Sequence, residues 1–265
     1  MTKKFIAGGC SFTFGNELSD DVNGNTPSAK TWAHGLCENA GMEYVCTASG
    51  GLGNQAIARR VFMAINSNED IGAVAVMWSF PSRYDWAMPE YKKLDGSRWV
   101  SISPWDTSKG HGEAMSKLAA SDIQQEIWQK RSEEIAKIGL RDFADSLYKN
   151  VTNEYHEIYL SWKSITWLQN ILEKRNIPFF FTLADNTLFY DQMRQHKDKD
   201  ELMTALYSEI DITKWFTFGE RMMGFNQWAL LNDYARATTH PLDEAHQDAV
   251  KLMLPTFNKL IGGQK

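Results

Sequence analysis

The sequence predicts an α/β protein built on a central, mostly parallel β-sheet. Three short apolar runs alternate with helical patterns in the order β-α-β-α-β up to Trp78. Glycines follow the first two runs, as expected where a strand ends in a tight turn. The third run, residues 71–78, is apolar on both faces, which is typical of a central parallel strand. This order favours a parallel sheet joined by right-handed crossovers.

The elements of the amino-terminal part follow from apolar periodicity and capping residues. We expect a strand at residues 5–9 and a helix at 28–40 that begins at Ser28 and stops at a glycine. A second strand is expected at residues 44–48. The next helix begins at Asn54, where apolar side chains recur at helical spacing.

The second half of the chain departs from this pattern. Residues 84–150 combine tryptophans with Gly, Pro, Ser and charges and then become helical and polar, so we expect an insertion within a single domain, 1–265, forming a lid or substrate wall. Helices are predicted at residues 153–174 and, beginning with Pro241, at 241–260. A fourth strand is predicted at 176–184, with its proline near the first residue.

Composition excludes several function classes. The chain has 265 residues and a formal net charge of -5, so its field repels nucleic acid. Three cysteines without metal-ligand spacing favour a reducing compartment and no metal. The longest apolar runs are too short for a membrane span, and the apolar stretch at residues 5–7 is too short for a signal peptide, so we expect a cytoplasmic location. The 10 Trp, 9 Tyr and 14 Phe suggest an aromatic surface for a partner or a sugar.

Ligands of open parallel sheets bind at the carboxyl ends of the strands, which directs attention to Ser11. Three segments of the chain resemble motifs of the SGNH (GDSL-type) hydrolase superfamily: residues 8–15 (GGCSFTFG), which contain Ser11, residues 48–54 (ASGGLGN), and His240-Pro241 with His246. The first block is most similar to a divergent branch common in phage and marine bacterial genomes. The resemblance runs from the first strand to the last helix, without most of the insertion, and implies a three-layer α/β/α sandwich.

The resemblance also implies a mechanism without a cofactor. Ser11 would be the nucleophile and His240 its general base. The backbone N–H groups of Ser11 and Gly51 would stabilise the oxyanion. The expected substrate is a carboxylic ester, small or attached to a carbohydrate, and the reaction is the removal of an acetyl or another small acyl group.

The chain departs from the family pattern after the third strand. Where the family has Gly-x-Asn-Asp, this chain has Ser79-Phe-Pro-Ser-Arg83, so the side-chain donor to the oxyanion must come from elsewhere. We favour Asn54, at a helix start, over Arg83; the alternative role of Asn54 is a plain helix cap. Arg83 is also a candidate substrate contact, together with Trp78 and Trp86.

The carboxylate that orients the base is the second departure. The family has Asp three residues before the histidine, where this chain has Ala237. We therefore consider Asp233, a carboxylate from another segment of the chain, or a Ser-His dyad without a carboxylate. Asp243 and His246, which do have the Asp-x-x-His spacing, form the alternative base pair.

Two other interpretations remain open. Gly51-x-Gly53-x-x-Ala56 fits a dinucleotide-binding fingerprint formally, but it follows the second strand and not the first. Because the family's Asp at position 237 and its Gly-x-Asn-Asp block are missing, the chain could instead be a non-catalytic binding or assembly module with the same fold. The resemblance to the phage-type branch is also compatible with a virion-associated role.

Overall fold

A parallel four-stranded sheet forms the centre of the molecule, as predicted. The computed structural model describes residues 2–22, 24–88, 98–119, 122–189 and 200–262. The strand order is β2-β1-β3-β6, and all three pairings are parallel. The strands are β1 (Lys4–Gly8), β2 (Glu43–Cys46), β3 (Ile71–Trp78) and β6 (Phe179–Leu183).

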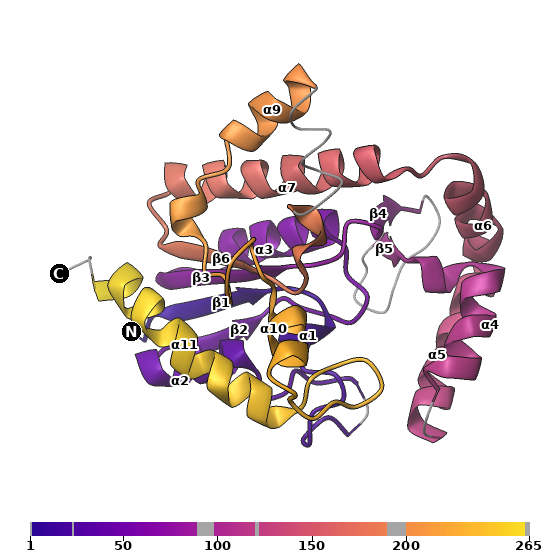
Figure 1. The fold of residues 1–265 in the computed structure, drawn as a ribbon, viewed down its shortest axis with the longest axis horizontal. Coiled ribbons are helices and arrows are strands. Elements are labelled where there is room, and N and C mark those ends of the chain that lie inside the picture. The colour runs from indigo at the N-terminus through magenta and orange to yellow at the C-terminus, as the bar shows by residue number, and fades with distance from the viewer. Residues whose placement is uncertain (1, 23, 89–97, 120–121, 190–199, 263–265) are drawn as a thin grey trace.

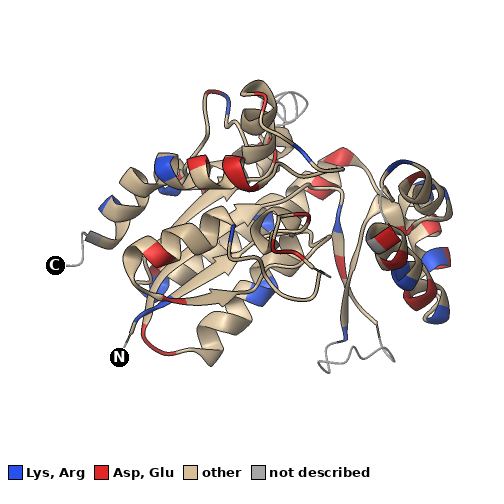
Figure 2. Cartoon of the chain, turned by 90° about the horizontal axis from the view of Figure 1, so that it is seen from below, with Lys and Arg blue, Asp and Glu red and all other residues tan. Residues whose placement is uncertain are grey.

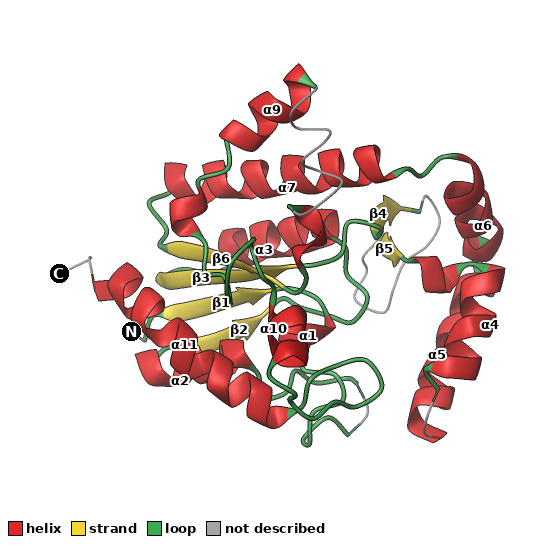
Figure 3. Cartoon of the chain, in the orientation of Figure 1, coloured by secondary structure: helices red, strands yellow, loops and turns green. Residues whose placement is uncertain are grey.

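Helices cover both faces of this sheet and complete the three-layer α/β/α sandwich (Figure 1). On one face lie α2 (Trp32–Ala40) and α11 (Asp243–Gly262), and on the other α3 (Asn54–Ser67) and α7 (Glu154–Lys174) (Figure 3). The ring of Phe180 on β6 meets Trp32 of α2 at 6.3 Å and Phe257 of α11 at 6.1 Å between centroids.

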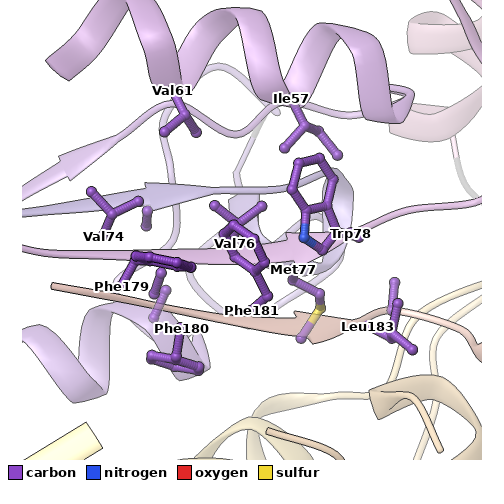
Figure 4. Close-up of a cluster of buried hydrophobic side chains, with 14 of the residues drawn as sticks. Ile57, Val61, Val74, Val76, Met77, Trp78, Phe179, Phe180, Phe181 and Leu183 are labelled. Carbon is purple, nitrogen blue, oxygen red and sulfur yellow. The ribbon is translucent and has the colours of Figure 1, made fainter. Parts of the chain in front are cut away.

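Strand β3 contributes side chains to the core on both faces of the sheet, because these side chains alternate between two faces that helices cover. Val76 and Trp78 point toward Ile57 of α3, whereas Met77 points to the opposite face (Figure 4). All of β3 from Ala73 to Trp78 is fully buried. Burial of a large apolar side chain such as Val76 or Met77 contributes about 1.5–3 kcal/mol relative to an exposed one, which explains the uninterrupted apolar run.

The segment 84–150, which we predicted to be an insertion and call the insertion below, has a hydrophobic cluster of its own. The strands β4 (Tyr84–Ala87) and β5 (Trp99–Ile102) pair antiparallel and lead to α4 (Ser108–Lys117), α5 (Asp122–Lys137) and α6 (Leu140–Asn150). Val100, Ile135 and Leu140 are buried together in this cluster. Charges of both signs crowd the surface of these helices (Figure 2). Residues 89–97 and 120–121 of the insertion lie outside the described residues.

Two predicted helix starts were wrong by a few residues. Helix α2 begins at Trp32, because the side chain of Thr31 accepts the His34 N–H and caps it. The Ser28 hydroxyl instead donates to Asp20 at 2.5 Å. Helix α11 begins at Asp243 and not at Pro241, because Pro241 takes part in a β-bridge with Arg236.

The other α-helices in the described part of the chain are α1 (Ser11–Phe14), α9 (Glu201–Ser208) and α10 (Phe225–Leu231). Helix α1 occupies the turn after β1 and α10 lies beside it (Figure 1). Among the described residues, no helix combines the length and the apolar character that crossing a membrane requires.

Candidate active site

Ser11 opens the short helix α1 directly after β1. The turn between them needs glycine, because a Cβ at Gly8 would lie 2.4 Å from Val61 and one at Gly9 would lie 2.1 Å from the Thr13 hydroxyl. The tight turn brings Ser11 to the carboxyl edge of the sheet, where only 7% of its surface is exposed. As the first residue of a helix, its N–H has no acceptor within the helix.

His240 reaches Ser11 from the other end of the chain. It lies on a tight turn closed by the Arg236–Pro241 bridge and by a hydrogen bond from the Ala237 N–H to the His240 carbonyl, at 3.0 Å. The distance from its Nε2 to the Ser11 Oγ is 2.8 Å. This is a hydrogen bond of the length that proton transfer from a hydroxyl to an imidazole requires.

The carboxylate that orients His240 is Glu17, which we did not predict. Glu17 Oε2 lies 2.6 Å from His240 Nδ1. The same oxygen accepts the Thr239 N–H at 3.0 Å, the Thr239 hydroxyl at 3.0 Å and the His240 N–H at 3.2 Å. Glu17 and His240 side chains are each 12% exposed, so water competes little with these bonds.

The ionisation of Glu17 fixes the tautomer of the base. Burial acts to raise the pKa of Glu17, but the hydrogen bonds from His240 and Thr239 and the attraction of His240 outweigh it and hold the pKa at about 2. An ionised carboxylate only accepts hydrogen bonds, so Nδ1 of His240 carries the proton. Nε2 is then left with its lone pair toward Ser11.

A loop built on two aspartates places Glu17 next to the histidine turn. Glu17 has φ of 69°, in the left-handed region, and its N–H donates to Asp21 at 2.9 Å. Asp21 also accepts the Gly24 N–H at 2.7 Å. Asp20 accepts the Ala29 N–H at 2.8 Å, which anchors the far end of the loop.

Asp233 is not the orienting carboxylate. It follows α10 with φ of 54° and is exposed, while Glu17 occupies Nδ1 of His240. The family pattern places the carboxylate three residues before the histidine, whereas here it lies six residues after the nucleophile. The signal available in the sequence was an acidic residue two positions after the first block.

The alternative pair of Asp243 and His246 is not formed either. Asp243 accepts the Ser19 N–H at 3.0 Å and the Ser19 hydroxyl at 2.5 Å. His246 is 1% exposed, and its Nδ1 accepts the Trp32 N–H at 3.2 Å at the start of α2. Burial, with a smaller electrostatic effect of the nearby His240, lowers the pKa of His246 to about 3, so His246 is neutral.

The structure does not leave Asn54 free as an oxyanion donor. Its Oδ1 accepts the Ser79 N–H at 2.7 Å, and its Nδ2 donates to the Ser79 carbonyl and the Ser161 hydroxyl, each at 3.0 Å. Both amide hydrogens are therefore engaged. Asn54 is also not the helix cap, because Gly53 holds that position, so its role is to fix the loop after β3.

Gly51 and Arg83 remain available at the same edge of the sheet. Gly51 has φ of 75°, which favours glycine, and lies on the exposed turn after β2. Arg83 Nη1 donates to the Ser79 hydroxyl at 2.9 Å and to the Leu52 carbonyl at 3.3 Å, so it links the loops after β2 and β3. Its guanidinium lies 4.9 Å above the Phe80 ring, and the Phe80 ring lies 6.4 Å from that of Phe12.

The two tryptophans predicted as substrate contacts lie elsewhere. Trp78 is fully buried in β3, where its ring packs against Phe181 at 5.2 Å, because the central strand has no solvent-facing side. Trp86 on β4 is 45% exposed and packs against Phe143 of α6 at 5.0 Å. Trp105 likewise packs against Trp128 within the insertion, at 6.3 Å. One contact from the insertion to the site comes from Gln124, which donates a hydrogen bond to Glu17.

No group of three or more His, Cys, Asp or Glu side chains suited to a metal ion occurs in the part of the chain that the structure describes. The Ser11–His240–Glu17 arrangement is of the kind used for nucleophilic acyl transfer: the hydroxyl can pass its proton to an imidazole that an ionised carboxylate holds in place.

Comparison with known proteins gives no match to a family model and no match among curated proteins. Solved structures similar to this chain include an acetyl xylan esterase from Butyrivibrio proteoclasticus, with 11% identity over 98% of this chain and a TM-score of 0.44. The chain spans 64% of that enzyme's length. A lipolytic protein of the G-D-S-L family from Veillonella parvula has 10% identity, a TM-score of 0.45, and coverage of 97% of this chain and 100% of its own. A carbohydrate acetylesterase family member from Sinorhizobium meliloti has 10% identity and a TM-score of 0.45, with coverage of 98% and 99%.

Proposed function

We propose that this protein is a serine-dependent hydrolase of carboxylic esters in which Ser11, His240 and Glu17 form the catalytic triad. One observation carries the proposal: His240 is hydrogen-bonded on one side to Ser11, at 2.8 Å, and on the other side to Glu17, at 2.6 Å. His240 lies far from both partners in the sequence. A buried hydroxyl, an imidazole and a carboxylate aligned in this way have an evident use in acyl transfer.

The reaction proceeds in two steps. In the first, the Ser11 Oγ attacks the ester carbonyl carbon while its proton moves to His240 Nε2, and the carbonyl oxygen becomes an oxyanion. The intermediate collapses, the C–O bond to the alcohol breaks, and the alkoxide leaves with the proton from Nε2. In the second step, water attacks the acyl-Ser11 ester in the same way and releases the carboxylic acid.

Donors at the sheet edge would stabilise the oxyanion. The Ser11 N–H at the start of α1 and the Gly51 N–H are the backbone candidates. With the Asn54 amide engaged elsewhere, Arg83 takes the third position in this proposal. Its guanidinium donates through Nη1 alone within the described residues, so Nη2 and Nε have capacity for a developing negative charge.

The substrate that we propose is a small acyl ester of a carbohydrate. Aromatic rings pack beside the base: Phe12 lies 4.8 Å from the His240 ring, and Phe225 lies 6.2 Å from Phe12. Large rings beside the catalytic histidine favour a short acyl group such as acetyl over a long chain.

Hydrolysis of p-nitrophenyl acetate by the parent, Ser11→Ala and His240→Ala proteins tests this function. We expect both variants to lose at least about a thousandfold in kcat/KM. Covalent labelling by a fluorophosphonate should require both residues. If Ser11→Ala hydrolyses the ester as fast as the parent, the proposal is wrong.

A second candidate is a non-catalytic binding module with the same fold. The engagement of the Asn54 amide by Ser79 and Ser161 favours it, because the usual side-chain donor to the oxyanion is missing. Absence of fluorophosphonate labelling at Ser11 in a folded protein would support this second candidate.

A further inference from the structure

A second pocket lies between the insertion and the helices α3 and α7. It has a volume of about 330 Å³ and is lined by residues of α3, of α7 and of the β4–β5 hairpin. Ser11, Glu17 and His240 do not line it. The pocket is therefore distinct from the candidate active site.

Two partly exposed tryptophans from different elements line this pocket. Trp99 on β5 is 39% exposed and Trp167 on α7 is 42% exposed. The Arg59 guanidinium lies 4.7 Å above the Trp99 ring, and Phe62 lies 5.1 Å from the Trp167 ring. Each indole is thus held in place by a neighbour on α3 while part of its surface stays in water. Rigid, half-exposed indoles in a pocket suit a flat apolar ligand face at low entropic cost.

The charges in the pocket do not cancel. The Asp85 carboxylate forms a two-bond ion pair with Arg59, whose Nε donates at 2.7 Å and whose Nη2 donates at 3.0 Å. The Asp85 side chain is only 2% exposed. Nη1 of Arg59 makes no hydrogen bond among the described residues, and the exposed Lys163 ammonium lies above the Tyr159 ring at 5.8 Å. With one carboxylate for two cations, the lining carries one net positive charge.

Polar groups for hydroxyl recognition lie beside these cations. Gln55 accepts the Asp85 N–H at 3.3 Å through Oε1, which leaves its amide hydrogens. The Ser164 hydroxyl donates to the Leu160 carbonyl at 2.8 Å, which leaves its oxygen as an acceptor. The pocket therefore combines indole faces, one excess cation, and both a donor and an acceptor.

We propose that this pocket is an accessory binding site for a carboxylate-bearing saccharide, that is, an oligosaccharide containing a uronic acid. The apolar C–H face of the pyranose ring packs on Trp167 and Trp99. Its carboxylate pairs with Lys163 and with Nη1 of Arg59, and its hydroxyls bond to Gln55 and Ser164. This site does not depend on the chemistry at Ser11, and it would hold a polymer substrate or host glycan near the molecule.

Calorimetric titration of the full-length Ser11→Ala protein tests the proposal without turnover. The probes are the trisaccharides of galacturonate, glucuronate and mannuronate, with uncharged cellotriose for comparison. We expect saturable binding of at least one uronate trisaccharide, at least about tenfold tighter than cellotriose, because its carboxylate adds hydrogen bonds to charged groups. The same binding should quench tryptophan fluorescence.

Variants at exposed positions decide whether this pocket is the site. Lys163→Gln and Trp167→Ala should each weaken uronate binding at least about tenfold. The matched control is Trp86→Ala, because Trp86 has a similar exposure of 45% on the same hairpin but does not line the pocket. Circular dichroism verifies the fold of each variant.

Three outcomes would overturn the proposal. The first is no saturable binding of any of the three uronate trisaccharides at millimolar concentration. The second is binding that Lys163→Gln and Trp167→Ala leave unchanged. The third is displacement of the trisaccharide by benzoate at equal concentration, which would indicate a site for aromatic acids. None of these outcomes depends on whether Ser11 is an active nucleophile.

Discussion

Gln124 donates a hydrogen bond from its side-chain amide to Glu17, across 107 residues of sequence. Its other amide atom, Oε1, accepts the Thr238 hydroxyl at 3.1 Å. Gln124 thus joins the loop that carries the carboxylate to the turn that carries His240. Because it lies near the start of α5, the insertion contributes to the geometry of the candidate active site.

Gln124→Ala should lower kcat by about fivefold to tenfold, because one hydrogen bond to a charged group is lost. KM should stay within twofold, since Gln124 orients Glu17 and touches no substrate in the proposed reaction. Steady-state hydrolysis of p-nitrophenyl acetate measures both constants. Gln125→Ala, at an exposed neighbouring position of α5, is the control and should match the parent. A rise in KM at unchanged kcat would contradict a positioning role.

Glu17→Gln should be far more damaging. The neutral amide can present an N–H to His240 Nδ1, which favours the tautomer with the proton on Nε2, and the developing imidazolium loses its counter-charge. Comparable losses of an orienting carboxylate reduce kcat by about 10⁴. Glu17→Asp keeps the charge on a shorter side chain and should retain more activity. Asp233→Asn should have no effect, because Asp233 is exposed and Glu17 is the carboxylate bonded to His240. Equal losses of kcat in Glu17→Gln and Asp233→Asn would count against the assignment of Glu17.

The buried His246 makes the fold sensitive to acid. Burial lowers its pKa from 6.5 to about 3. Between these two values the unfolded chain binds a proton that the folded protein does not, so its contribution to the free energy of unfolding is complete above pH 6.5 and is lost as the pH falls toward 3. His246→Gln keeps an acceptor for the Trp32 N–H but removes the titration. Urea unfolding from pH 7 to pH 4 should therefore show a flatter decline in this variant; an unchanged slope would refute the role of His246.

The core could be predicted from sequence because its determinants are local. The eight-residue apolar run of β3 by itself predicts a buried strand. The predicted helix 153–174 was correct to within a residue, because Asn153 caps it and its apolar face is periodic. The site was harder to predict. Ser11 follows from the first strand and its glycines, but its carboxylate partner depends on how two loops fold against each other. Glu17 meets His240 across 223 residues, and the aspartate-built loop after α1, tied to the histidine turn by Gln124, brings them together.

The same distinction explains the wrong expectation for Asn54. A polar residue at a helix start looks available, yet its amide is buried and hydrogen-bonded to Ser79 and to Ser161 on α7, 107 residues further along the chain. The prediction that Trp78 contacts substrate was wrong for a related reason. The strand end was located correctly, but a central strand keeps its last side chain inside the core.

Arg83 and Asn54 can be separated by comparing activity with stability. Arg83→Ala should reduce kcat by about a hundredfold, as is typical of losing one oxyanion donor, while the free energy of unfolding changes little, because the guanidinium is partly exposed. Asn54→Ala should instead destabilise the fold by about 1–3 kcal/mol for each buried partner left unpaired. Any loss of activity in Asn54→Ala should be indirect, through the displaced loop after β3. Ester hydrolysis and urea unfolding of the same preparations measure the two effects. If Arg83→Ala keeps full activity while Asn54→Ala loses it without destabilisation, the assignment of the third oxyanion donor to Arg83 is wrong.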